Sequence, residues 1–133
     1  MISIRGAVKM AVAAAVFSAA YVLLVVLPYH VNDLDRFSPA DVAGGAHDPK
    51  DLWPTTIPYV GGWLHLGGVV SMLVAPMTLL VVALVCGFTS VQAVRLRAWT
   101  AAGVHTAVAV VCAVAGAWFS SPLARALATW QLD

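Results

Sequence analysis

The sequence predicts an all-α integral membrane protein with three transmembrane helices. Of the 133 residues, 62% are hydrophobic and only 10% are charged. Three long apolar runs, at about residues 10–29, 60–88 and 98–120, contain no Asp, Glu, Lys or Arg. A helix of about 20 residues crosses a hydrocarbon core about 30 Å thick. Because the runs are continuously apolar and not alternating, they favour helices over a β-barrel, and we expect residues 1–133 to form a single domain.

The first span follows two basic residues, Arg5 and Lys9. Together with Ser18-Ala19-Ala20, they resemble the start of a secretory signal peptide. The apolar run nevertheless continues without a break to Tyr29. We therefore interpret this segment as an uncleaved first span.

The second span is bounded and interrupted by prolines. Pro54 and Pro58 oppose a helix before Tyr59. Pro76 lies near the middle of the span, where it removes one backbone hydrogen bond and should kink the helix.

A short amphipathic helix is expected after the third span, at about residues 122–131. Ser121 and Pro122 are typical of an N-cap and a first helical position. Four apolar residues then recur at helical spacing: Leu123, Ala126, Leu127 and Trp130. We expect this helix to lie on the membrane surface or to pack on a partner subunit.

Residues 30–59 form the longest polar segment, and we expect them to be an extracytoplasmic loop. The segment contains five aspartates and two histidines but no EF-hand spacing and no His-x-x-x-His pair, so we expect no metal site. Its four prolines indicate an ordered, irregular path. Phe37, Leu52 and Trp53 indicate that the loop docks on the membrane surface or on a neighbouring protein.

The charged residues predict how the chain is oriented. Arg5, Lys9, Arg95 and Arg97 lie on one side of the predicted spans, whereas all six acidic residues lie on the other. The positive-inside rule then places the N-terminus in the cytoplasm and the C-terminus outside. The Ala-, Val- and Arg-rich composition is typical of a bacterium with GC-rich DNA, so the expected location is a bacterial cytoplasmic (inner) membrane.

Small residues recur along each span and predict where helices pack. Lipid is as apolar as a leucine side chain, so membrane helices associate through close packing at small residues. The predicted packing rows are Ala11, Ala15 and Ala19 in the first span, Gly67, Ser71 and Ala75 in the second, and Cys112, Gly116 and Ser120 in the third. Because alanine is abundant in this chain, some such rows also arise from composition alone.

Only two histidines, His65 and His105, bring ionisable imidazoles into the spans. Ionisable residues within a membrane are candidates for function, so either histidine could bind haem b or a quinone. Their expected depths differ by about 13 Å, which argues against one haem shared by both. The alternative, in which each ring bonds a nearby carbonyl or hydroxyl, needs no cofactor, and no cofactor is expected.

Motifs for catalysis are missing from the sequence. It contains no Gly-x-Ser-x-Gly, His-Glu-x-x-His, P-loop or dinucleotide fingerprint, and no glutamate. A net charge of +1 without a basic stripe predicts no nucleic-acid partner. We therefore expect a non-catalytic accessory subunit whose partners are the lipid bilayer and other membrane subunits, in a bacterial respiratory assembly as the first choice. The alternatives are a haem- or quinone-binding anchor, and a small homo-oligomeric transporter or a subunit of a transport or envelope-biogenesis complex.

Overall fold

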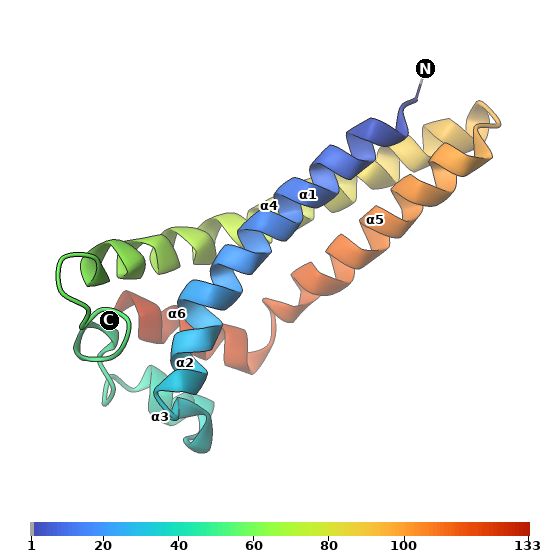
Figure 1. Ribbon diagram of the computed structural model, residues 1–133. Helices are drawn as coiled ribbons and strands as arrows, with labels where there is room; N and C mark the ends of the chain where they lie inside the picture. Colours follow the sequence, from blue (N-terminus) through green and yellow to red (C-terminus); the bar gives the residue numbers. More distant parts are fainter. Residues whose placement is uncertain (1) are drawn as a thin grey trace.

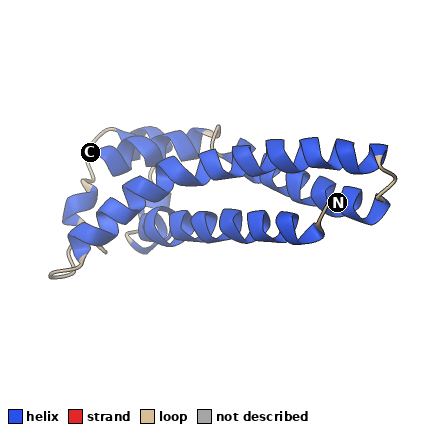
Figure 2. Ribbon diagram, turned by 90° about the horizontal axis from the view of Figure 1, so that it is seen from above, coloured by secondary structure: helices blue, strands red, loops and turns tan. Residues whose placement is uncertain are grey.

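A computed structural model describes residues 2–133, and every regular element within them is helical (Figure 2). Three segments are long and apolar enough to cross a membrane: Ile4–Val31, Gly61–Arg95 and Trp99–Trp118. The first segment contains α1 and α2, the second is α4, and the third is α5. Helices α1 and α5 both pack against α4 (Figure 1). The predicted all-α membrane fold with three spans is confirmed.

The first span begins earlier than its apolar run. Helix α1 (Ile4–Tyr21) starts after Ser3, whose Oγ accepts a hydrogen bond of 3.2 Å from the Arg5 main-chain N–H. Arg5 and Lys9 therefore lie within the helix, where their long side chains can still reach the headgroup layer. The charge-free run therefore locates the part of the helix that suits hydrocarbon, but it does not locate where the helix begins or ends.

A π-helical turn, Val22–Val26, connects α1 to α2 (Leu27–Val31). Pro28 explains the turn, because a proline lacks an N–H and its ring clashes with the carbonyl of the residue four positions earlier, here Leu24. The widened turn moves that carbonyl aside, and the Leu27 N–H bonds instead to the Val22 main-chain oxygen. The sequence pattern predicted an uninterrupted span because hydropathy is insensitive to this local change.

Helices α4 (Gly61–Arg95) and α5 (Trp99–Trp118) differ greatly in length, with 35 and 20 residues. At 1.5 Å per residue they rise about 52 Å and about 30 Å. The second span was predicted at 60–88, and α4 continues about two turns further, to Arg95. The hydroxyls of Thr89 and Ser90 can lie in this extension because each donates a hydrogen bond to a backbone carbonyl. Helix α5 therefore covers only part of α4.

The two ends of the bundle carry opposite charge, and we call them the basic end and the acidic end. The basic end holds the start of α1 and the turn between α4 and α5, with Arg5, Lys9, Arg95 and Arg97. The acidic end holds the loop, α6 and all six aspartates. The two chain ends lie at opposite ends of the bundle (Figure 1), as an odd number of spans requires.

The loop at the acidic end contains three short helices: Leu34–Arg36, α3 (Pro39–Ala43) and Pro49–Asp51. Helix α6 (Pro122–Leu132) follows α5 closely and packs against α3 and α4 (Figure 1). Ser121 caps α6 by accepting the Ala124 N–H at 3.1 Å, and Pro122 occupies the first turn. The predicted C-terminal helix is therefore present, one residue longer than expected.

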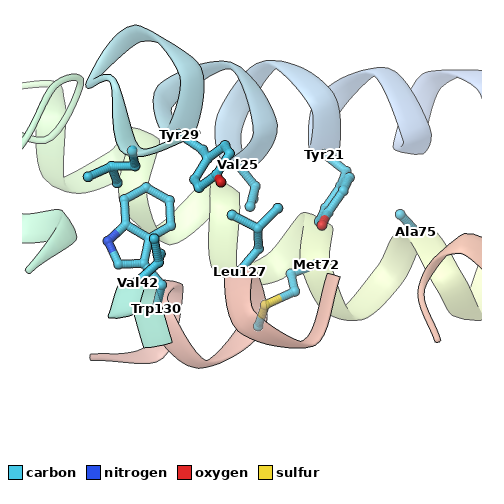
Figure 3. Close-up of a cluster of buried hydrophobic side chains, with 9 residues drawn as sticks. Tyr21, Val25, Tyr29, Val42, Met72, Ala75, Leu127 and Trp130 are labelled. Atoms are coloured by element: carbon cyan, nitrogen blue, oxygen red, sulfur yellow. The ribbon is translucent and has the colours of Figure 1, made fainter. Parts of the chain in front are cut away.

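The apolar face of α6 is buried within the chain, whereas we expected it to meet the membrane surface or a partner subunit. Leu127 and Trp130 are 0% and 1% exposed. They pack in a cluster that we call the cap core (Figure 3), whose other members are Tyr21, Val25, Tyr29, Leu34, Val42, Met72 and Ala75. Residues from the first span, the loop, α4 and α6 thus share one small core at the acidic end.

Candidate functional site

The two histidines predicted as cofactor ligands lie far apart along the bundle. The side chains of Ser90 and Thr106 touch at 2.6 Å, which fixes the depth of the neighbouring His105 relative to α4. From residue 65 to residue 90, α4 rises about 37 Å. This separation exceeds the predicted 13 Å because α4 is much longer than one core thickness. One haem held by both histidines of a single chain is therefore excluded.

His105 is buried and bonded within its own helix. Its side chain is 4% exposed, and Nδ1 lies 2.8 Å from the Ala101 main-chain oxygen. The ring N–H donates to this carbonyl one turn earlier in α5. The His105 ring therefore makes the hydrogen bond to a nearby carbonyl that was expected as the alternative to cofactor binding.

His65 is half-buried and connects α4 to α6. The Gln131 side-chain amide donates to His65 Nδ1 at 3.1 Å and, more weakly, to the His65 main-chain oxygen at 3.4 Å. Gly68 makes room for this amide, because a Cβ there would lie 2.7 Å from Gln131 Nε2 and 3.1 Å from the Leu24 main-chain oxygen. His65 therefore helps to hold α6 in place.

Three further polar contacts hold the loop at the acidic end. Trp130 Nε1 donates to the His47 main-chain oxygen at 2.6 Å, and Lys50 Nζ donates to the Asp133 main-chain oxygen at 2.5 Å. Within the loop, Asn32 Nδ2 donates to the Trp53 main-chain oxygen at 2.7 Å. Two of these contacts join residues 83 positions apart, so no local sequence pattern could predict them.

Metal-binding groups do not converge in the part of the chain that the structure describes. Within residues 2–133, no three side chains of His, Cys, Asp or Glu are grouped so that they could hold a metal ion. Among the loop's aspartates, Asp48 instead caps a short helix by accepting the Lys50 main-chain N–H at 2.8 Å.

The predicted packing residues fall into three classes of burial. Ser71, Ala75 and Cys112 are buried between helices, Ala11, Gly67 and Gly116 are half-buried, and Ala15, Ala19 and Ser120 are exposed. The buried side of the first span is instead formed by Ala7, Ala14, Tyr21 and Val25. The predicted row in the first span therefore lies beside the contact with α4. Two of its members, Ala11 and Ala15, line a groove between α1 and α5.

This groove, which we call the α1–α5 groove, runs between α1 and α5 above Leu79 of α4. It has a volume of about 420 Å³ and is lined by Ala11, Ala14, Ala15, Ser18, Ala107, Val108, Val111, Cys112 and Ala115. A second hollow of about 280 Å³, next to Tyr21, Trp118 and Phe119, continues it towards the acidic end and shares Ser18, Leu79 and Ala115. Most of the lining side chains are no larger than a hydroxymethyl or thiol group.

The lipid-facing surface of α4 is built from much larger side chains. The exposed residues along α4 include Leu66, Val70, Leu73, Met77, Leu80, Leu84 and Phe88. Large, flexible side chains suit lipid, whereas small ones permit the close approach of another helix backbone. The α1–α5 groove therefore differs chemically from the lipid-facing surface of α4.

Replacing Ser90 by alanine should weaken the contact between α4 and α5. Ser90 Oγ donates to the Ala102 main-chain oxygen at 3.1 Å and accepts from the Thr106 hydroxyl at 2.6 Å. A hydrogen bond between membrane helices contributes about 1 kcal/mol, so we expect Ser90→Ala to lower the free energy of unfolding by about that amount in detergent. Thr89→Ala is the control, because Thr89 bonds only the Val85 carbonyl of its own helix. Equal effects of the two substitutions would contradict this role for Ser90.

Comparisons with known proteins identify no relative of this chain. No protein family matches the sequence. No curated protein and no solved structure matches it either.

Proposed function

We propose that this protein is a non-catalytic accessory subunit of a larger membrane complex, and that its α1–α5 groove receives a transmembrane helix of a partner subunit. The lining of the groove carries this proposal. Two helices present alanine, serine and cysteine side chains towards it, with Ala15 and Ala107 exposed at its walls. Such a surface lets a third helix approach closely along both walls.

Packing forces favour a helix over lipid in this groove. Within the bilayer there is no hydrophobic force between helices, so association depends on van der Waals contact and on interhelical hydrogen bonds. Ser18 in the lining also offers a hydroxyl group to a partner. A helix with small residues of its own would gain contact with both α1 and α5.

The use of the chain's polar side chains supports a structural role. His105 is bonded to its own helix, and His65 is bonded to Gln131. At the acidic end, Trp130 and Lys50 bind the loop to the C-terminal helix. These contacts hold the fold together, and the exposed apolar surface within the spans is suited to packing against another helix.

We place the protein in the bacterial cytoplasmic membrane with its basic end in the cytoplasm. Arg5, Lys9, Arg95 and Arg97 support this orientation under the positive-inside rule. A respiratory assembly is the first choice for the host complex, because such assemblies often contain small membrane-spanning subunits without catalytic groups. A transport or envelope-biogenesis complex is the alternative.

Photo-crosslinking in the native membrane tests the proposal. A photoreactive amino acid at Ala15 or Ala107 should crosslink to a transmembrane segment of one defined partner protein, identified by mass spectrometry. The same probe at Ala13, which is exposed on α1 outside the groove, should give lipid adducts only. Crosslinks to lipid alone at all three positions would contradict the proposal.

Filling the groove should displace the partner. We expect Ala15→Phe to reduce the amount of partner that co-purifies in mild detergent at least tenfold, because the new ring would occupy the space of the incoming helix. Ala13→Phe adds the same ring on the exposed side of α1 and should leave the amount of partner unchanged. An equal loss in both variants would indicate a general effect on folding or expression and would contradict a role for the groove.

A further inference from the structure

The basic end contains an open pocket between the beginnings of α1 and α5. Its volume is about 670 Å³, and it is lined by residues 2–5 and 97–101. Arg5 and Arg97 both line it, so two basic residues border one cavity. All six aspartates lie at the acidic end, so no described acidic side chain is near enough to neutralise Arg5 and Arg97.

The start of α5 adds hydrogen-bond donors to the same pocket. Ser3 caps α1, but α5 begins after Ala98, which has no side-chain oxygen with which to cap the helix. Trp99, Thr100 and Ala101 form the first turn of α5 and line the pocket. The N–H groups of a first turn have no acceptor within the helix, and they carry the positive end of the helix dipole.

This combination of donors fits the oxygens of a phosphate group. A guanidinium can donate two parallel N–H bonds to a phosphate, and the main-chain N–H groups at the start of a helix bind the same anion. Phosphate oxygens in the cavity would also relieve the repulsion between Arg5 and Arg97. The pocket thus offers charge and directed donors from two helices, whereas an isolated basic residue at a membrane surface offers charge alone.

The position of Trp99 points to a lipid as the source of the phosphate. Its side chain is 67% exposed at the edge of the pocket. Exposed tryptophans at the ends of membrane helices lie at the level of the lipid headgroups. We propose that this pocket binds the phosphate of an anionic phospholipid headgroup from the adjoining leaflet.

Native mass spectrometry of the full chain in detergent tests the proposal. Titration with phosphatidylglycerol should load one lipid per chain in preference to phosphatidylcholine. A basic side chain next to an anionic lipid contributes about a fivefold gain in affinity, so R5Q/R97Q should bind phosphatidylglycerol about 25-fold more weakly. K9Q/R95Q removes the same charge from the same end but outside the pocket, and its affinity should fall less than threefold.

Ala98→Asp gives a second test that does not depend on removing arginines. The new carboxylate would cap α5, which should stabilise the helix, and would occupy the donors that the phosphate needs. We expect a higher unfolding temperature together with loss of phosphatidylglycerol binding. A structural role for the pocket alone would not move these two readouts in opposite directions.

Three results would overturn the proposal. Equal weakening of phosphatidylglycerol binding in R5Q/R97Q and K9Q/R95Q would show that only the total charge of the basic end matters. Equal binding of phosphatidylcholine and phosphatidylglycerol would show that the pocket does not select an anionic lipid. Displacement of the lipid by equimolar inorganic phosphate would show that free phosphate, and not a lipid headgroup, is the ligand.

Discussion

Replacing Trp130 by alanine is expected to lower the free energy of unfolding by about 3–5 kcal/mol, the range for removing a large buried aromatic side chain. Trp130 is 1% exposed and lies in the cap core, where its ring meets Tyr29 at a centroid distance of 6.5 Å. Its indole N–H also donates to the His47 main-chain oxygen. The substitution therefore removes packing and the hydrogen bond that joins the loop to α6.

Chemical unfolding in detergent, followed by circular dichroism, measures this effect of Trp130→Ala. Leu132→Ala is the matched control, because Leu132 lies in the same helix but is 64% exposed and should change stability by less than about 0.5 kcal/mol. Trp130→Phe keeps most of the ring and should cost about 1–3 kcal/mol through the lost hydrogen bond. Similar stability of the Trp130→Ala and Leu132→Ala proteins would contradict the existence of a cap core.

Replacing Gly61 by alanine is expected to displace the loop from the start of α4. A Cβ at this position would lie 1.9 Å from the Thr55 main-chain oxygen and 2.5 Å from its carbonyl carbon. These are backbone atoms, so no side-chain rotation can relieve the clash, and we expect a cost of about 3 kcal/mol. The displacement should also weaken the bond of 2.9 Å between the Gly61 N–H and the Ile57 main-chain oxygen.

Limited proteolysis provides the measurement for Gly61→Ala, since cleavage within residues 44–60 should become much faster when the loop is released. Gly62→Ala is the control, because a Cβ at Gly62 meets no atom within 4 Å. This neighbouring substitution should leave the cleavage rate unchanged or slow it slightly, since alanine favours a helix. If both variants resist protease like the unmodified protein, the close approach of Thr55 to Gly61 is wrong.

The sequence was sufficient to predict the three spans and α6. It predicted neither the three short helices of the loop, which was expected to be irregular, nor the arrangement at the acidic end. The absence of charge over about 20 residues is a local property, so hydropathy located all three spans, and Ser121 with Pro122 located α6. Two helices extend beyond the ends predicted from the apolar runs. Long basic side chains such as Lys9, and hydroxyls that are hydrogen-bonded such as that of Ser90, are compatible with a membrane helix. Pro28 was the one local signal that could have predicted the π-helical turn.

Contacts between distant residues explain why the candidate site was harder to predict. The rows of small residues were visible in the sequence, but which side of each helix faces α4 depends on how three helices pack together. Ala14 is buried in a cluster with Leu79 of α4, whereas Ala15 is exposed at the wall of the groove, although they are neighbours in the chain. In the same way, Arg5 and Arg97 share a pocket only because α1 and α5 begin side by side.

The length of α4 has a consequence for the membrane itself. Membrane helices tilt by at most about 40°, and at that angle a helix of about 52 Å still spans about 40 Å along the bilayer normal. A typical hydrocarbon core is about 30 Å thick. At least one end of α4 must therefore extend past the hydrocarbon, and Trp63 and Leu66, which are 74% and 51% exposed, lie at one such end. This hydrophobic mismatch is reduced in a thicker bilayer, so the protein should partition towards thicker membranes when it is given a choice of two.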